Sequence, residues 1–324
     1  VLFRSFNSNF ICYKSDMEKG EGLDIAKKYS VKNYPTFLWL DGTGKQIHRS
    51  VGSTTVPNFM IIATSANTPQ NNLSYYSEQY KTGNRKPDML LAYANQLRSA
   101  YDMTYQTVAD EYFHTLPGAE LRNKDSWQAI LDFTPNMNSF IWSVMVKNPK
   151  SFYDIYGKDS VDHVMDNLAL ESLSYATQQK DSMLLTKAVS RLKQSSSRDV
   201  QADAAAGEMD YYKRNKNYSK YVELAHDYVG RYFMDNAKQL NAICWTYFQR
   251  IGDKTQLLEA ERWIAQSVKL DDSYYNTDTY ANLLDKEGKK KEAIEMAKHS
   301  IEQAKKSGED FSETQALLEK LMRE

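Results

Sequence analysis

The sequence predicts a mainly α-helical protein that begins with a short segment of mixed α/β character. All seven prolines lie at or before Pro149, and residues 150–324 contain only six glycines. Because proline breaks the interior of a helix, this proline-free stretch is expected to be nearly all helix. Residues 1–60 differ, since short β-rich runs there are punctuated by glycine. The length fits roughly two domains, and the patterns divide the chain into three segments, 1–66, 67–200 and 201–324.

Composition and charge exclude several classes of function. The chain is 41% apolar and 26% charged, and 41 Lys and Arg against 42 Asp and Glu leave a net charge of -1. This balance gives no bulk electrostatic attraction to nucleic acid or to anionic membranes. No apolar run approaches the ~20 residues that span a bilayer. No HExxH, GxGxxG or Walker motif occurs, so we expect no nucleic-acid partner, no membrane span, no metal and no cofactor.

Short local patterns predict the elements of the first segment. Residues 10–16 have the composition of a strand, and residues 23–29 place apolar side chains on one helical face. Thr36–Leu40 is a continuous apolar run of strand length, as expected where both faces of a sheet are covered. Residues 41–44 supply a glycine-containing turn into a second strand at Gln46–Val51. Together these two strands predict a hairpin.

From about residue 67 the apolar residues follow a helical periodicity. Upstream of residue 67, Thr54 or Thr55 can cap a helix that carries Pro57 in its first turn. Apolar residues then recur at helical spacing over 140–145, over 161–169 and at Leu90, Tyr93, Ala94, Leu97 and Tyr101. We interpret these stripes as core packing, because a cofactor would also need liganding groups and none converge on them.

The last third of the chain contains a weak internal repeat. The repeated positions are Ala260, Ile264 and Ser267 against Ala293, Ala297 and Ser300, and Trp245, Phe248 and Gly252 against Ala281, Leu284 and Gly288. A possible earlier copy is Tyr221, Ala225 and Tyr228. Small residues let two antiparallel helices approach closely, and the glycine marks the turn between them. The pattern resembles the tetratricopeptide repeat, whose period is ~34 residues, and this resemblance implies protein or peptide partners.

A second resemblance covers residues 6–60. The segment VKNYPT at 31–36 follows a predicted helix and precedes a hairpin that ends at Gly52. This order and spacing resemble the second half of a thioredoxin domain. More narrowly, the chain is similar to thioredoxin-like proteins of Gram-negative cell envelopes that carry long helical extensions, which residues 67–170 resemble. The resemblance implies a thiol–disulfide oxidoreductase of the periplasm or cell envelope.

The thioredoxin resemblance implies a substrate-binding loop at Tyr34, Pro35 and Thr36. Pro35 then corresponds to the family's cis-proline, and packing can lock that isomer because a cis X–Pro bond costs only ~0.5–1 kcal/mol. The loop turns the backbone of Tyr34 toward the redox motif, where a substrate peptide can pair with it as an added strand. A trans proline that opens a strand is the alternative.

The sequence departs from the family at the catalytic centre. The Cys-x-x-Cys helix and the first two strands of the family belong upstream of Phe10 and are absent, so we assign no catalytic residue. We interpret Cys12 and Cys244 as buried apolar fillers. Thiol–disulfide exchange needs an accessible low-pKa thiolate and usually a resolving thiol. We therefore expect this chain to have no such activity. Without those strands, the strand predicted at 10–16 lacks ladder neighbours, and Thr36–Leu40 keeps only its hairpin partner.

Two further features concern charge and the start of the chain. Lys286 and residues 289–291 form a basic patch interleaved with acidic residues, which we interpret as a solvated face rather than a phosphate site. Residues 2–5 read LFRS, which the end of a common sequencing adapter encodes in one frame. We hypothesise that the natural sequence begins near Phe6 and that the reading frame was cut; an ordinary N-terminus is the alternative. The nucleotides of codons 2–5 decide between them.

The predicted fold class is mainly α, with a partial thioredoxin-like α/β segment followed by tetratricopeptide-like helical hairpins. Two functions are consistent with it. The first is a fragment of a cell-envelope thioredoxin-like oxidoreductase, inactive without its Cys-x-x-Cys. The second is a non-catalytic protein-interaction module with a thioredoxin-fold remnant. A glutathione transferase is discounted, because Gly52-Ser53-Thr54 replaces that family's helix start and its helical domain is about half as long.

Overall fold

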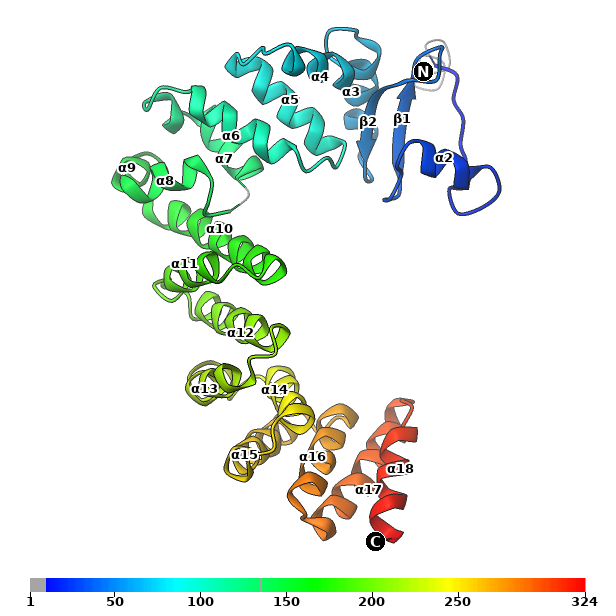
Figure 1. Ribbon diagram of the computed structural model, residues 1–324, viewed down its shortest axis with the longest axis vertical. Helices are drawn as coiled ribbons and strands as arrows, with labels where there is room; N and C mark the ends of the chain where they lie inside the picture. The colour runs from blue at the N-terminus through cyan, green and yellow to red at the C-terminus, as the bar shows by residue number, and fades with distance from the viewer. Residues whose placement is uncertain (1–9, 135, 324) are drawn as a thin grey trace. The chain divides into compact units, whose positions relative to one another are not determined.

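The computed structural model describes residues 10–134 and 136–323 (Figure 1). Within these residues it is mainly helical, with 71% helix in 17 α-helices and one two-stranded antiparallel sheet. The chain forms two compact units, of which the first runs to Ile155 and the second begins at Tyr156 and also includes Asn136–Asn138. The predicted mainly α class is confirmed, whereas the boundaries at residues 66 and 200 stay predictions.

The strand predicted at residues 10–16 is wrong, because these residues form neither strand nor helix. A strand needs a neighbour for its backbone N–H and C=O groups, and the two strands in the described residues pair only with each other. Helix α2 (Gly22–Lys28) follows, close to the predicted position. Its first residue has to be glycine, because a Cβ at Gly22 would lie 1.9 Å from the carbonyl oxygen of Asp16.

Strands β1 (Thr36–Leu40) and β2 (Gln46–Val51) form the predicted hairpin. Trp39 lies opposite His48, and the register shifts just after this pair. The carboxylate of Asp41 organises the turn by accepting three hydrogen bonds from the residues that follow. The prediction that β1 keeps only its hairpin partner is confirmed for the described residues.

Helix α3 (Val56–Asn67) packs on the hairpin. Thr55 caps the helix by accepting a hydrogen bond from the Asn58 N–H at 3.5 Å, and Pro57 lies in the first turn, as predicted. The inner face of α3 joins Phe37, Trp39 and Ile47 of the hairpin in a small apolar cluster through Phe59, Ile62, Ala63 and Ala66.

The rest of the first unit is helical. The helices are α4 (Leu73–Lys81), α5 (Pro87–Ser99), α6 (Tyr105–Thr115), the 3-10 turn η1 (Glu120–Arg122), α7 (Lys124–Phe133), α8 (Phe140–Lys147) and α9 (Lys150–Tyr156). The stripe predicted on α5 is buried from Leu90 to Leu97. Tyr101 does not continue it, because the helix has already ended and Tyr101 is 66% exposed with a φ of 59°.

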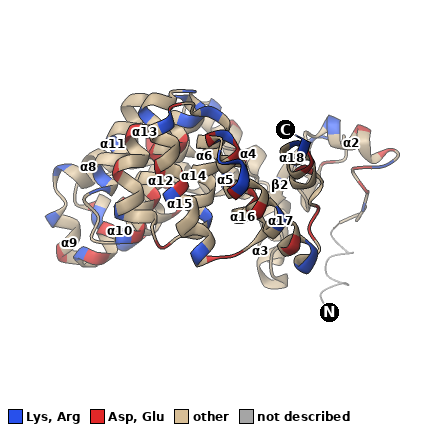
Figure 2. Ribbon diagram, turned by 90° about the horizontal axis from the view of Figure 1, so that it is seen from below, with Lys and Arg blue, Asp and Glu red and all other residues tan. Residues whose placement is uncertain are grey.

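The second unit consists of consecutive helices that pack on their neighbours. They are α10 (Lys158–Gln179), α11 (Ser182–Leu192), α12 (Arg198–Arg214), α13 (Tyr218–Tyr228), the π-helix η2 (Val229–Phe233), α14 (Ala237–Arg250), α15 (Lys254–Leu270), α16 (Tyr274–Glu287), α17 (Lys290–Ser307) and α18 (Ser312–Arg323). None of the helices described in either unit is long and apolar enough to cross a membrane. Acidic and basic residues are interspersed along them (Figure 2), as the net charge of -1 leads one to expect.

The sequence repeat corresponds to two helix pairs, α14 with α15 and α16 with α17. The repeated serines make the same contact in both pairs. Ser267 on α15 donates its hydroxyl to the carbonyl of Ala237, the first residue of α14, at 2.8 Å. Ser300 on α17 donates to the carbonyl of Tyr274, the first residue of α16, at 3.3 Å. Both serines are fully buried, so the repeat is structural, although its membership of the tetratricopeptide class stays a prediction.

Candidate binding surfaces

The predicted substrate-binding residues lie together at the start of β1. Tyr34 is 55% exposed, and the Tyr34–Pro35 peptide bond is cis. The hydroxyl of Thr36, the first residue of β1, donates to the carbonyl oxygen of Asn33 at 2.6 Å and closes the loop. The Pro35 carbonyl accepts the Gly52 N–H at 2.9 Å, which extends the hairpin by one hydrogen bond. The loop therefore presents an exposed aromatic ring beside an ordered strand.

The hydrogen bond from Gly52 to Pro35 fixes which way the backbone of β1 faces. Along an antiparallel strand, successive residues bond alternately to the partner strand and away from it. Phe37 and Trp39 therefore direct their backbone groups to β2, and Thr36 and Leu38 direct theirs to the opposite edge. No strand of the described chain covers that edge. This edge, called here the β1 edge, begins directly at the Tyr34–Pro35 loop.

Arg49 attaches the end of α2 to the sheet. Its guanidinium donates to the carbonyl oxygens of Tyr29 at 2.9 Å and Ser30 at 3.1 Å, just past the last residue of the helix. Burial lowers the pKa of Arg49, and the carboxylate of Asp102 counteracts that effect. A positive charge at a helix C-terminus also stabilises the helix dipole. The contact holds α2 on the sheet close to the Tyr34–Pro35 loop.

The two cysteines have different surroundings. Cys244 is fully buried as predicted, its thiol donates to the carbonyl of Ala260 at 3.3 Å, and burial raises its pKa. Cys12 is exposed, so its interpretation as a buried filler is wrong. The reason is that the segment around it forms no strand and has no sheet to cover it. Cys244 lies in the core of the second unit, and Cys12 belongs to the first.

His48 on β2 is a residue that sequence reasoning missed. It is only 1% exposed, and its Nδ1 accepts a hydrogen bond from the Leu73 N–H, at the start of α4, at 3.2 Å. Its ring meets Trp39 edge to face, with 5.3 Å between the centroids. Burial lowers the pKa of His48 to about 4. The acceptor role requires the neutral imidazole, so His48 is a structural link between β2 and α4.

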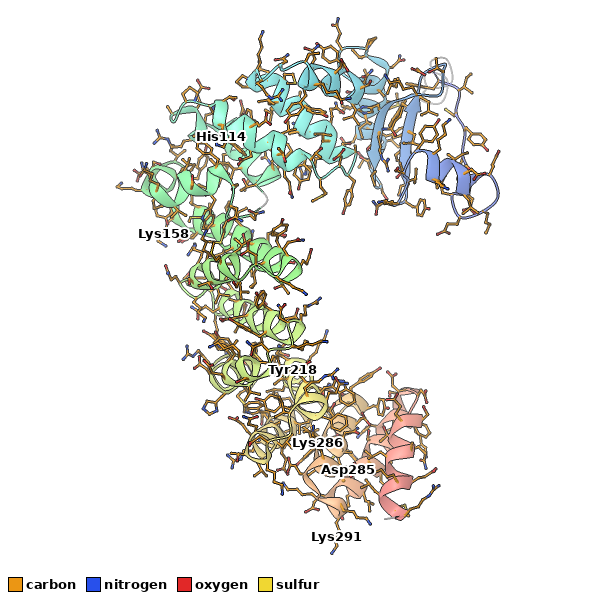
Figure 3. All side chains as sticks on the ribbon, in the orientation of Figure 1. His114, Lys158, Tyr218, Asp285, Lys286 and Lys291 are labelled. Atoms are coloured by element: carbon orange, nitrogen blue, oxygen red, sulfur yellow. The ribbon has the colours of Figure 1, made fainter. Side chains whose placement is uncertain are left out.

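The basic patch around Lys286 is partly exposed, as predicted, and two of its lysines also make structural contacts. Lys286 donates to the last carbonyls of α14, at Tyr247 and Phe248, and its Nζ lies 5.8 Å from the Phe248 ring centroid. Burial lowers the pKa of Lys286. Lys289 pairs with Glu261 at 2.5 Å and with Glu287 at 2.8 Å. Lys291, farther along in Figure 3, is exposed. Lys286 and Lys289 thus connect α16 and the turn after it to the preceding helix pair, through the α14 carbonyls and Glu261.

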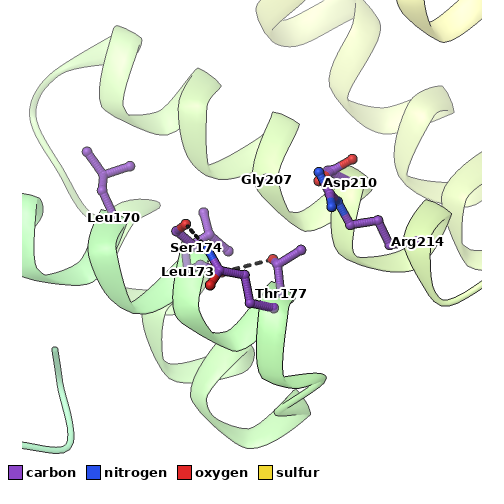
Figure 4. Close-up of a pocket in the computed structure, with 8 residues that line it drawn as sticks. Leu170, Leu173, Ser174, Thr177, Gly207, Asp210 and Arg214 are labelled. Atoms are coloured by element: carbon purple, nitrogen blue, oxygen red, sulfur yellow. Dashed lines mark hydrogen bonds and ion pairs between the residues drawn. The ribbon is translucent and has the colours of Figure 1, made fainter. Parts of the chain in front are cut away.

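A groove of about 290 Å³ lies between α10 and α12 (Figure 4). Its polar groups bond mainly within their own helices: the Thr177 hydroxyl donates to the Leu173 carbonyl at 2.9 Å, and Arg214 pairs with Asp210 at 2.5 Å. Gly207 forms part of its lining, and α10 and α12 approach so closely there that a Cβ would lie 2.5 Å from Leu173 Cδ2. The groove is therefore a consequence of close helix packing, and we assign no ligand to it.

Neither a search for metal-ligand clusters nor comparison with known proteins identifies a ligand for these surfaces. In the part of the chain that the structure describes, no three His, Cys, Asp or Glu side chains are grouped so that they could hold a metal ion. Comparison of the chain with models of known protein families and with curated proteins gives no match. The resemblances to thioredoxin-like and tetratricopeptide proteins therefore stay predictions from the residues.

Proposed function

We propose that this chain is a protein-interaction module that binds an extended peptide segment along the β1 edge, beside Tyr34. The observation that supports this most directly is the orientation of β1. Its residues Thr36 and Leu38 direct backbone donors and acceptors toward an edge that no described strand covers. A peptide added there gains main-chain hydrogen bonds in the manner of a new strand. The exposed ring of Tyr34 supplies an aromatic contact at the end of the same edge.

The second unit supports a binding role in a different way. Its helix pairs repeat the same serine-to-carbonyl contact, and Leu283 of α16 is buried in the same cluster as residues of α14 and α15. Stacked helical pairs of this type create extended surfaces while each pair contacts only its neighbours. The proposal assigns partner binding to both units and assigns peptide recognition to the β1 edge.

A backbone variant tests this assignment. The N–H of Leu38 points to the open edge, so Leu38→Pro removes a donor that an added strand needs while leaving the hairpin's own bonds in place. The probe is fluorescently labelled, reduced and carboxymethylated α-lactalbumin, whose binding is followed by fluorescence anisotropy. We expect the wild-type chain to bind it and Leu38→Pro to weaken binding roughly fivefold, since the one main-chain hydrogen bond that is lost is worth about 1 kcal/mol.

Control variants keep the test interpretable. Tyr34→Ala is expected to weaken binding, whereas Tyr175→Ala, which truncates a similarly exposed tyrosine on α10, is expected to leave it unchanged. Near-ultraviolet circular dichroism establishes that each variant keeps its tertiary structure. Equal binding by a folded Leu38→Pro variant, or no binding by the wild type, contradicts the proposal.

We also propose a second candidate, that the complete protein is a thiol–disulfide oxidoreductase of the cell envelope. The elements follow one another as helix α2, the Tyr34–Pro35 loop, the β1–β2 hairpin and helix α3. This order favours the resemblance to thioredoxin. In that protein the β1 edge and the loop would present a substrate to cysteines that this chain does not contain. The complete gene decides: a Cys-x-x-Cys codon pattern upstream of Phe10 is expected, and its absence there leaves only the interaction module.

A further inference from the structure

Residues 11–15, which precede helix α2, are a second element of the first unit that has no ladder neighbour. Ile11 is fully exposed and Tyr13 is 69% exposed, although isoleucine and tyrosine are residue types that favour strands. In the structure these residues form neither strand nor helix. A short stretch with strand-forming residues therefore lies exposed in the same unit as the uncovered β1 edge. We call residues 11–15 the strap.

Two contacts hold the ends of the strap near β1 and α2. Phe10, directly before it, packs on the apolar cluster that contains Phe37 and Trp39 of β1. The Tyr13 hydroxyl donates to the carboxylate of Glu21, the residue before the first turn of α2. In Figure 1 the dark-blue segment runs in the direction opposite to the β1 arrow. An extended strap that keeps the Phe10 contact therefore lies antiparallel to β1.

We infer that the strap is an internal competitor that closes the β1 edge by pairing with it as an antiparallel strand. This inference rests on the proposed function, because the strap regulates the same peptide-binding edge. The structure shows the open form. Closure replaces the freedom of an exposed segment by main-chain hydrogen bonds, and these two opposing free energies are of similar size. Both forms are therefore populated, and a peptide binds only the open one.

The packing of Phe10 determines which strap residues bond to β1. Its ring lies on the face of the sheet that carries Phe37, and side chains along a strand alternate between the two faces. Ile11 and Tyr13 then share the other face with Leu38. In an antiparallel pair, directly opposite residues share a face, and at hydrogen-bonded positions they exchange both backbone bonds. Since Leu38 directs its backbone to the open edge, the residue opposite it is Ile11 or Tyr13.

Paired proline variants test this arrangement with the carboxymethylated α-lactalbumin probe. Ile11→Pro combined with Tyr13→Pro removes two N–H donors that face β1 in the closed form, so we expect peptide binding to tighten roughly two- to threefold. Cys12→Pro combined with Lys14→Pro is the matched control. Its missing donors face away from β1, where proline is tolerated on an edge strand, and we expect the affinity of the wild type.

A disulfide tests closure without any peptide. In a Cys12→Ser background, Tyr13→Cys is combined in turn with Thr36→Cys, Leu38→Cys and Leu40→Cys, because the register determines which of these lies opposite. One combination is expected to form a disulfide within the monomer under mild oxidation, since opposite Cα atoms at such positions are about 5.5 Å apart. The oxidised chain is expected to bind the probe at least tenfold more weakly than the same chain after reduction with dithiothreitol.

The control for the disulfide is Lys14→Cys with the same partner cysteine, which is expected to stay reduced because its side chain lies on the other face of the sheet. The inference is overturned if no combination with Tyr13→Cys forms a disulfide, or if the oxidised and reduced chains bind the probe equally. Equal effects of the two proline pairs overturn it as well. A chain that forms the disulfide but binds no probe when reduced confirms the strap and contradicts the proposed peptide binding.

Discussion

At the scale of single residues, His48 shows how burial determines a role that the sequence does not reveal. A lone histidine in a strand carries no signal of its own, and its function depends on a partner 25 positions away, the Leu73 N–H. That hydrogen bond satisfies one of the backbone donors left unpaired at the start of α4. A buried acceptor of this kind is stabilising only while the ring is neutral. Acid is therefore expected to weaken the link between β2 and α4.

The stability of the first unit is expected to fall in acid because of His48. The pKa is about 4 in the folded chain and 6.5 in the unfolded chain. Between these values the unfolded chain binds a proton that the folded chain excludes, so the free energy of unfolding falls as the pH falls, by roughly 3 kcal/mol in all. His48→Asn keeps an acceptor for Leu73 and does not titrate, so it is expected to lose this part of the pH dependence.

Urea titrations at pH 7 and pH 4.5 measure the effect of His48. The Trp39 indole resonance in proton–nitrogen correlation spectra reports the packing around His48, since the two rings are in contact. The wild type is expected to lose more stability than His48→Asn between the two pH values. Equal losses in the two proteins would show that other groups, and not His48, are responsible.

At the scale of elements, local signals were sufficient for some predictions and insufficient for others. The hairpin, helix α2 and the Thr55 cap of α3 are encoded by neighbouring residues, so they are predicted correctly. The strand at 10–16 depends on distant neighbours, and its composition alone misleads. For the same reason Cys12 is exposed although its sequence surroundings are apolar.

The candidate site was predictable only in part. The loop at Tyr34, Pro35 and Thr36 is apparent from the sequence, and the structure places these residues together at the start of β1. The uncovered edge of β1 was predicted too, because the sequence lacks the strands that the thioredoxin resemblance places beside Thr36–Leu40, and no described strand lies there. The carbonyl partners of Lys286 lie on another helix, 38 and 39 positions away, so the local pattern predicted its exposure but not these hydrogen bonds.

Helix packing around Gly207 gives a prediction at this scale. Replacing Gly207 by Ala favours the helix by about 1 kcal/mol but drives a methyl group into Leu173, whose Cδ2 and Cγ lie 2.5 and 2.9 Å from the Cβ position. Leu173 is 4% exposed, and its Cγ as well as its Cδ2 has to shift to make space for the added methyl group. Overpacking costs about 1–3 kcal/mol, so we expect a net loss of stability of roughly 1 kcal/mol.

Two comparisons check the Gly207 prediction by thermal unfolding. Gly230→Ala is the matched control, because a Cβ at Gly230 meets nothing within 4 Å, and it is expected to leave the melting temperature unchanged or to raise it. Gly207→Ala combined with Leu173→Ala is expected to lose less stability than the two single losses added together, since the clash is then removed. A Gly207→Ala variant as stable as Gly230→Ala would show that α10 and α12 separate without cost.

At the scale of the whole molecule, the two units differ in how their cores are built. The cluster under the hairpin has Trp39, Ala63 and Ala66 as its buried residues, and an isolated two-stranded hairpin is marginal in water. The second unit contains a cluster of 19 buried residues that runs from Ala205 on α12 to Leu283 on α16. Local opening requires less free energy where few apolar contacts have to break.

We therefore expect amide hydrogen exchange to be fast across residues 10–55 and slow across residues 240–305. The first range includes the irregular segment before α2, where Ile11 is fully exposed, and the hairpin that has one partner per strand. The second range includes α14 to α17, whose repeated small residues Ala260, Ala293 and Ala297 are fully buried between the helices. Exchange followed by mass spectrometry on peptides from the native chain at pH 7 measures both ranges in one experiment. Protection across residues 10–55 equal to that of residues 240–305 would mean that the hairpin and the helices packed on it open only with the whole unit, and that two strands suffice for a stable sheet in this chain.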